Sequence, residues 1–500
     1  MAKRRMQQRP TGVGVTIPTV ENDRPHASTL HRAALAASAA AGFGVYLGHS
    51  AGGWCFVRPQ HSVMVLGPPR SGKTTSLLIP NVLAANGPVV STSTKLDVLD
   101  ATNHARARLG RCFLFDPTGS TECPGDLEPL RWSPLQSCGT WSGALATARS
   151  LVDVGSGSQA IRRADDSHWN ERAQSLLAPL LHAAALDGAD MRTLLAWVDR
   201  RKALPARQIL TGTPGGSAEL ADNLLDGIVT TDERELSGIW STASSALTGF
   251  RTEQALAATV DPRFDPSAFV TSSDTIYVAA SAHRQALVAP MVVGLIEDVR
   301  DATYAGATHG QGPPSLPPVL LALDEVANIA PLPSLPSMVS EGGGQGLVTV
   351  ACLQDLSQAR HRWRDQADGF PSLFGATVVL PGIGDVRTLE ALTTLAGDEE
   401  IPTRSVTTGR SPSGHPVGDL MTGGRLHVGQ SAGTQWRRRL PPDMIARGST
   451  GHALVFDERN QAAWVPLAPA HAAEPWSTIT GAGHQRNHQH ARRLGADIER

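Results

Sequence analysis

Residues 67–74 have the sequence Gly-Pro-Pro-Arg-Ser-Gly-Lys-Thr, which matches the phosphate-binding pattern G-x-x-x-x-G-K-[ST] at every fixed position. The four residues before this stretch, 63–66, form an apolar run typical of a short buried strand. Residues 75–85 after it have the composition of a helix. Because this pattern marks a site only between a strand and a helix, the context predicts a phosphate-binding loop rather than a chance match.

The residue types of the loop suit phosphate binding. Glycines let the backbone approach the phosphates, and successive N–H groups together with the helix N-terminus attract an anion. We expect Lys73 to reach the β- and γ-phosphates and Thr74 to hold Mg²⁺. The predicted ligands are therefore ATP and Mg²⁺, and the predicted phosphate-binding positions are Gly67, Pro68, Pro69, Arg70, Ser71, Gly72, Lys73, Thr74 and Thr75.

A second motif occupies residues 319–325, where the run Val-Leu-Leu-Ala-Leu ends in Asp324 and Glu325. An apolar run of this kind predicts a strand buried on both faces, which places the two acids at the carboxyl end of a parallel sheet, where ligands bind. We expect Asp324 to hold Mg²⁺ through water. Glu325 is placed to polarise the attacking water, a task that positioned carboxylates perform.

Gln354 ends another apolar run, residues 347–353. A polar side chain at that edge of the sheet can sense the γ-phosphate or position water. A helix cap or a turn residue is the alternative interpretation. The predicted catalytic residues are Glu325, Lys73 and Gln354.

Length and composition indicate a globular chain of two or three domains, since 500 residues exceed one ordinary domain. A hydrophobic content of 41% and a charged content of 18% exclude a disordered chain, and a net charge of −2 gives no overall attraction to nucleic acid. The five cysteines form no C-x-x-C pair, which predicts neither a disulfide framework nor a zinc site and favours the cytoplasm.

Strand-like and helical stretches alternate before residue 140 and again after residue 261, which predicts an α/β fold with a doubly wound, mostly parallel sheet. Only helical patterns occur in between, so an all-α domain is expected as an insertion within the ATPase domain. The predicted organisation is a disordered arm (1–30), the first part of the ATPase domain (31–139), the all-α insertion (140–260), the second part of the ATPase domain (261–467) with a mobile Gly/Ser-rich segment (401–433), and a disordered tail (468–500).

An uncharged stretch near the N-terminus, residues 33–47, is the one candidate for a membrane segment. It is shorter than the roughly 20 residues of a typical transmembrane helix, and it consists mainly of Ala and Gly. A soluble helix followed by a strand is the expected structure.

The chain resembles the coupling ATPases of type IV secretion and conjugation, the TraG/TraD-like group of the FtsK–HerA superfamily. The resemblance rests on 67–74 with the following Thr-Ser-Leu-Leu-Ile-Pro-Asn-Val-Leu, on 89–97, on Phe115-Asp116-Pro117 with 132–135, on 323–329, and on the Gly-rich turn 342–346 leading to 353–358. It implies a RecA-like P-loop motor with an inserted all-α domain, a hexameric ring, and DNA or protein–DNA substrates. Relaxase or secretion-channel proteins are implied as partners.

Two departures from the family matter. Members usually carry transmembrane helices before the motor, so any membrane attachment of this chain is expected through a partner. Members often place an arginine near the Gly-rich turn to act across the subunit interface, and Gly343 stands there in this chain. The nearest substitutes are Arg360, Arg362 and Arg364.

The main functional prediction is an ATPase that drives DNA transfer. A slow nucleotide-dependent adaptor that recruits substrates to a secretion channel is the alternative, favoured by the missing arginine and membrane span. A small-molecule kinase would not need the acid pair and the distant glutamine. The run Trp436-Arg437-Arg438-Arg439 can stack on bases and contact phosphates, but short arginine runs in so Arg-rich a chain are more often solvated surface.

Overall fold

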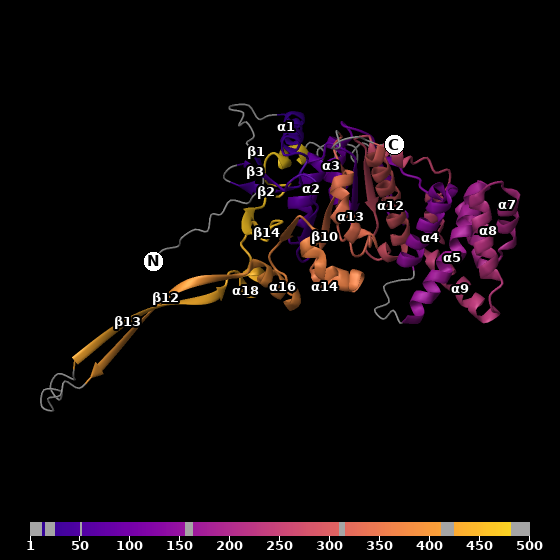
Figure 1. The fold of residues 1–500 in the computed structure, drawn as a ribbon. Coiled ribbons are helices and arrows are strands. Elements are labelled where there is room, and N and C mark those ends of the chain that lie inside the picture. Colours follow the sequence, from indigo (N-terminus) through magenta and orange to yellow (C-terminus); the bar gives the residue numbers. More distant parts are fainter. Residues whose placement is uncertain are drawn as a thin grey trace, which may run out of the picture.

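The computed structural model is built around a ten-stranded sheet with the order β15-β14-β11-β4-β10-β9-β5-β8-β6-β7 (Figure 1). It describes residues 13–15, 26–50, 53–155, 164–309, 316–411 and 425–481. The eight strands from β11 to β7 are parallel. The strands of this sheet are β4 (Val63–Leu66), β5 (Val89–Ser93), β6 (Cys112–Phe115), β7 (Glu128–Pro129), β8 (Thr275–Ala279), β9 (Val319–Leu323), β10 (Leu347–Leu353), β11 (Ala376–Val379), β14 (His452–Phe456) and β15 (Ala462–Pro466).

Helices cover both faces of this sheet, so the predicted doubly wound α/β fold is confirmed. They are α1 (Ala27–Ala40), α2 (Ile79–Ala84), α3 (Asp97–Arg106), α4 (Trp141–Gly155), α5 (Ala164–Leu186), α6 (Met191–Asp199), α7 (Leu204–Gly212), α8 (Gly216–Val229), α9 (Glu233–Ala246), α10 (Glu253–Ala258), α11 (Pro266–Val270), α12 (Gln285–His309), α13 (Leu335–Glu341), α14 (Leu356–Trp363), α15 (Phe370–Leu373), α16 (Val386–Ala396) and α18 (Pro442–Arg447). Every described helix falls short of the length or the apolar character that a membrane crossing requires.

The strands bury alternate residues in two separate cores. Met64 and Leu66 of β4 belong to the core shared with α12 and the helical block, whereas Val63 and Val65 belong to the core shared with α1, α2 and α3. Because side chains alternate across a strand, a strand that is buried on both faces must be apolar throughout. This explains why the central strands appear in the sequence as continuous apolar runs.

Helices alone connect β7 to β8 in the described part of that segment, and α4, α5, α7, α8 and α9 gather at one end of the molecule (Figure 1). α5 is the centre of this block, because Leu176, Leu180 and Ala184 on it are fully buried. α4 also packs against α12 of the sheet layer. The boundaries that we assign to an inserted domain stay a prediction.

Both predicted disordered ends contain structure. β1 (Val13–Val15) pairs antiparallel with β3 (Gly53–Phe56), and α1 begins at Ala27, so the prediction of a disordered arm is wrong for these residues. β3 also pairs antiparallel with β2 (Tyr46–Ser50). Residues 1–12 and 16–25 lie outside the described structure.

The predicted C-terminal tail is wrong up to residue 481. Trp476 is fully buried, stacks on Trp54 with 4.9 Å between ring centroids, and meets the edge of Tyr46 at 5.3 Å. Burying a tryptophan contributes several kcal/mol at most, enough to hold a short terminal segment against the small sheet. The rest of the predicted tail, 482–500, lies outside the described residues. β14 and β15 pair antiparallel at the edge of the large sheet.

The predicted mobile loop at 401–433 is also corrected. β12 (Asp398–Ser411) and β13 (Arg425–Arg438) form one long antiparallel hairpin, which projects from the body beside α16 and α18 (Figure 1). Its many Gly, Ser and Thr residues suggested a loop. Its Thr and Val residues, however, favour extended backbone, so the two segments can pair as strands. Residues 412–424 lie outside the described structure.

A carboxylate joins α12 to the segment that leads into the helical block. Asp298 accepts a 2.7 Å hydrogen bond from the Trp132 indole N–H and a 2.5 Å hydrogen bond from the Ser137 hydroxyl. Burial raises the pKa of Asp298 to about 6, although both hydrogen bonds oppose the shift. The unfolded chain releases this proton near pH 4, so the stability linked to it is full below that pH and is lost as the pH rises through 6.

We predict that Asp298→Asn makes stability less dependent on pH. The amide keeps the size of the side chain and carries no charge to bury. The unfolding free energy of the variant should therefore gain on that of the parent by roughly 1–3 kcal/mol between pH 4.5 and pH 7.5. Thermal unfolding followed by circular dichroism at both pH values measures this gain. A constant difference between variant and parent would show that Asp298 stays ionised in the folded protein.

Candidate nucleotide-binding site

Three adjacent parallel strands bring the two sequence motifs to one edge of the sheet. β10 lies between β4 and β9, with Leu353 level with Leu66 and Ala351 level with Leu323. β4 ends at Leu66, and the phosphate-loop sequence begins at the next residue, Gly67. The Gly67 N–H donates to the Leu353 carbonyl at 3.1 Å. Motifs 250 residues apart in the chain therefore meet at the carboxyl edge of the sheet.

The loop 67–74 is closed by its own lysine. Lys73 is buried, and its Nζ donates to the carbonyl oxygens of Gly67 at 2.5 Å and Pro68 at 3.0 Å. Arg70 and Gly72 have positive φ angles of 63° and 98°, a left-handed geometry that turns successive N–H groups toward one side. The Ser71 hydroxyl is buried without a protein partner. An ammonium group and an unpartnered hydroxyl inside a curled backbone are the features of an anion site.

Thr74 and Asp324 are in direct contact. The Thr74 hydroxyl donates to the Asp324 carboxylate at 2.9 Å, and the second carboxylate oxygen accepts from the Glu325 N–H at 3.1 Å. Burial raises the pKa of Asp324, and the neighbouring Glu325 adds to this effect, while Thr74 and Lys73 oppose it. A divalent cation at this point would favour the ionised carboxylate, so the donor set suits Mg²⁺.

Glu325 occupies a strained backbone position. Its φ is +48°, in the left-handed region that costs a non-glycine residue about 1–3 kcal/mol. Two hydrogen bonds maintain it, because the N–H groups of Asn328 and Ile329 both donate to the Glu325 carbonyl, at 2.8 Å and 3.1 Å. The side chain is half-buried beside Asp324. The left-handed backbone at Glu325 prevents the strand from continuing and keeps the carboxylate at the edge of the sheet. No sequence pattern indicated this strain.

Gln354 lies between the two motifs, one residue beyond β10. It is half-buried, and its backbone N–H donates to the Gln358 side chain at 2.9 Å. The following residue, Asp355, caps α14 by accepting from the Ser357 N–H. The helix cap that was the alternative interpretation of Gln354 is therefore provided by Asp355 instead. The catalytic role of Gln354 stays a prediction.

The helix after the loop contains a feature that sequence reasoning missed. It opens with a π-helical turn, Thr74–Leu78, before α2 begins at Ile79. The Ile79 N–H donates to Thr74, and Pro80 has no N–H, so the Thr75 carbonyl has no donor within the helix. The Ala470 N–H donates to it at 2.8 Å. The C-terminal segment therefore rests directly on the predicted nucleotide loop, and Pro80 was the one signal of this arrangement.

The three candidate arginines lie on or beside α14. Arg360 is paired within its own chain, with Asp368 at 3.2 Å and Asp385 at 3.4 Å. Arg362 is half-buried, and Arg364 is exposed at the end of the helix with a φ of +53°. α14 starts at the carboxyl edge immediately after Gln354, and these arginines occupy its far turn. Their action across a subunit interface stays a prediction.

The Gly-rich turn leaves no room for a side chain at Gly343. It belongs to a 3₁₀ turn, Gly342–Gln345, that lies at the amino edge of the sheet before β10. A Cβ atom at Gly343 would lie 1.8 Å from the Gln60 carbonyl oxygen, so the position excludes every side chain. The neighbouring Gly344 has open space at the same place. The contact with residue 60 requires glycine at position 343.

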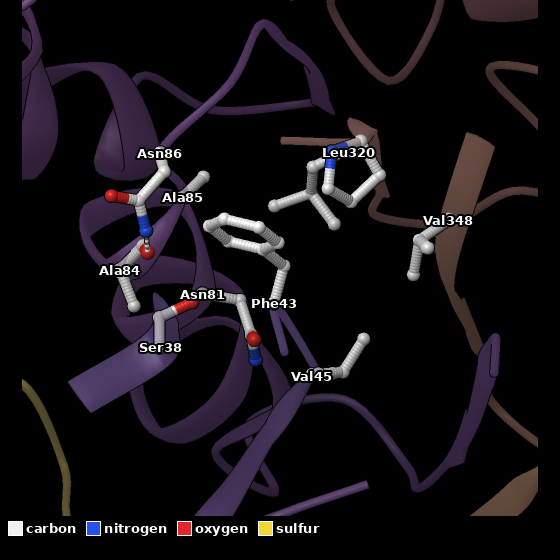
Figure 2. Close-up of a pocket in the computed structure, with 11 residues that line it drawn as sticks. Ser38, Phe43, Val45, Asn81, Ala84, Ala85, Asn86, Leu320 and Val348 are labelled. Carbon is white, nitrogen blue, oxygen red and sulfur yellow. Dashed lines mark hydrogen bonds between the residues drawn. The ribbon is translucent and has the colours of Figure 1, made fainter. Parts of the chain in front are cut away.

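Figure 2 shows a cavity at this amino edge, away from the two motifs. Its lining comes from three parts of the chain: Phe43 and Val45 in the N-terminal segment, Asn86 just after α2, and Leu320 and Val348 near the starts of β9 and β10. Its volume of about 30 Å³ is enough for one or two water molecules. It is a packing defect between layers and too small for a nucleotide.

Comparison with known proteins gives a family match and several structural matches. A family model described as type IV secretory system conjugative DNA transfer matches residues 15–408. No curated protein sequence matches the chain. Among solved structures, the chain is similar to the bacterial conjugative coupling protein TrwBdeltaN70 in an unbound form, with a TM-score of 0.61, 18% identity, and coverage of 83% of this chain and 87% of that chain.

Structures of TrwB with ligands are similar to the same degree. The complex with a non-hydrolysable ATP analogue gives a TM-score of 0.60 at 18% identity, covering 83% of this chain and 87% of that chain. The complex with ADP and Mg²⁺ gives 0.60 at 19% identity, covering 82% and 86%. Identity at this level shows a shared fold, which agrees with the RecA-like architecture expected from the sequence.

We predict that Gly343→Ala destabilises the protein and Gly344→Ala does not. The methyl group at 343 must displace backbone, which costs about 2 kcal/mol or more, whereas the methyl group at 344 enters open space. Chemical unfolding of both variants and the parent measures this difference. Equal midpoints for the two alanine variants would mean that the turn moves freely and that position 343 can accept a longer side chain.

Proposed function

The chain belongs to the type IV secretory system conjugative DNA transfer family, and from this membership we propose that it is an ATP-hydrolysing coupling motor for DNA transfer. One observation carries the proposal: the 2.9 Å contact between the Thr74 hydroxyl and the Asp324 carboxylate. This contact brings the loop 67–74 and the acid pair Asp324–Glu325 together. ATP hydrolysis requires these two motifs to be adjacent.

The residues fit ATP and Mg²⁺. Lys73 and the N–H groups of the loop would hold the phosphates, and Thr74 and Asp324 would hold the metal ion. Bound Mg²⁺ supplies neutralisation of the charge that develops on the phosphoryl oxygens. Lys73, Thr74 and Asp324 already lie at the same edge of the sheet, and binding would replace the hydrogen bonds from Lys73 to the loop carbonyls and from Thr74 to Asp324.

Glu325 is the proposed general base. Its carboxylate polarises the attacking water and accepts a proton from it, while the strained backbone holds the side chain beside Asp324. Gln354, between the two motifs, is proposed to position that water or to respond to the γ-phosphate. Arg360, Arg362 or Arg364 would act on the nucleotide of a neighbouring subunit.

DNA is the proposed substrate, since the family is defined by conjugative DNA transfer. A homohexameric ring, relaxase or secretion-channel proteins as partners, and attachment to the membrane through such partners complete the proposal. The resemblance of the motifs to coupling ATPases supports these points.

The adaptor function remains the second candidate, and Gly343 favours it. The position excludes the arginine that members of the family often carry there, so fast hydrolysis across an interface would need one of the α14 arginines. The ATPase rate with and without single- and double-stranded DNA separates the two candidates. A motor accelerates with DNA, whereas an adaptor stays slow.

We predict that Lys73→Ala abolishes ATP binding, because it removes the buried cation that faces the phosphate loop. Lys202→Ala, at an exposed position between α6 and α7, is the matched control and should bind ATP as the parent does. Titration with a fluorescent ATP analogue measures both affinities. Equal affinity for Lys73→Ala and the parent would refute the assignment of the loop.

We predict that Glu325→Gln binds ATP but hydrolyses it about 10²–10⁴ times more slowly, since an amide cannot accept the proton. Asp324→Asn should instead weaken Mg²⁺-dependent binding as well. Nucleotide affinity, turnover and mass by light scattering, measured on both variants, distinguish the two roles. Near-normal turnover of Glu325→Gln would transfer the role of base to another residue.

A further inference from the structure

The hairpin β12–β13 is an arm without a partner in the described structure. Its strands pair with each other in a separate two-stranded sheet, from Asp398 opposite Arg438 to Ser411 opposite Arg425. Fourteen residues at about 3.4 Å each make the arm about 45 Å long. Figure 1 shows it projecting on the side of the molecule opposite the helical block. An ordered arm of this length exposes both faces, so its function lies in what it contacts.

The two faces of the arm differ. Residues opposite each other in an antiparallel pair share a face, so Arg404, Val406 and Val428 lie on one face, and the two valines are 58% and 55% exposed. The other face carries small and hydroxyl-bearing residues, among them Thr403, Ser405, Thr407, Gly429, Ser431 and Gly433. The arm is therefore a thin ribbon that another molecule can approach closely on one side.

Charge separates the base of the arm from its outer part. At the base, Arg438 forms an ion pair with Asp398 at 3.7 Å, and Arg437 lies opposite Glu399 in the register. We call the described residues 401–411 and 425–435 the distal arm. The distal arm contains three arginines, at 404, 410 and 425, and neither aspartate nor glutamate. The chain as a whole has a net charge of −2, so this concentration of positive charge is local.

We propose that the distal arm binds the groove of duplex DNA. This inference rests on the proposed function, which provides DNA as substrate, and adds the element that contacts it. The family match ends at residue 408, so β13 lies beyond the part of the chain that the family model describes.

The dimensions and chemistry of the ribbon suit this partner. The major groove of B-DNA is about 12 Å wide and admits a two-stranded β-ribbon. The three arginines of the distal arm attract the phosphate backbone, and Ser and Thr hydroxyl groups donate to phosphate oxygens. The valine pair contacts the apolar sugar edges. A second copy of this chain is the competing occupant, and the experiment below distinguishes it.

The test replaces residues 402–434 of the full chain with Asn-Gly. The replacement leaves Ile401 and Gln435, which are paired in the native register, joined by a two-residue hairpin turn. Fluorescence anisotropy with a labelled 40-base-pair duplex and a 40-nucleotide single strand measures binding. We expect the duplex Kd to rise at least tenfold, the single-strand Kd to change less, and the slope of log K against log salt to fall by about 3.

Two point variants sharpen the test. Arg404→Glu should raise the duplex Kd several-fold, whereas Arg192→Glu, an equal charge change at an exposed position of α6, should leave it unchanged. ATP affinity and circular dichroism equal to those of the parent show that each variant is folded. A loss of duplex affinity with Arg192→Glu as large as that with Arg404→Glu would attribute binding to net charge and overturn the proposal.

The remaining outcomes separate this inference from the proposed function. If the parent binds duplex DNA and the armless chain binds it within twofold, the arm is not the contact and the motor assignment stands. If the armless chain loses oligomer mass in light scattering while Arg404→Glu keeps full duplex affinity, the arm docks on a second copy of the chain. If the parent binds no DNA, both the DNA substrate and this inference fail.

Discussion

Parallel pairing of β10 with β4 on one side and β9 on the other is the constraint on which the candidate site depends. The ladder sets Leu353 level with Leu66 and Ala351 level with Leu323, so three strand ends come to one edge. A shift of one residue would exchange the side chains that fill the two cores and would move Asp324 along the edge relative to Thr74. The same register that fills both cores therefore also sets the distance from Thr74 to Asp324.

Support for the phosphate loop comes from segments far along the chain. The π-helical turn after the loop leaves the Thr75 carbonyl without a helical donor, and the Ala470 N–H provides one. Asn81, in the next turn, accepts from the Tyr46 N–H and donates to the Tyr46 carbonyl, which attaches the small N-terminal sheet to the same helix. Trp476 closes this layer against Tyr46. The loop and the helix after it are thus held by segments from the N-terminal and the C-terminal parts of the described chain.

Two features lie outside the nucleotide edge of the sheet. The turn at Gly343 packs so closely on residue 60 that it has no room for a side chain, which restricts any trans-acting arginine to other positions such as those on α14. The arm β12–β13 is a long ribbon whose described outer part carries arginines and no acidic residue.

The sequence alone was sufficient for the α/β fold, the phosphate loop and the acid pair, because strands buried on both faces must be continuous apolar runs and the loop requires glycines at set positions. It was insufficient for the left-handed Glu325, the arm and the docking of Trp476. Each of these depends on a partner distant in sequence: the carbonyl of Glu325 on the folded turn 326–329, β12 on a strand that begins at Arg425, and Trp476 on Trp54. Local composition cannot encode such partners, since pairing and burial are decided only when the chain closes on itself.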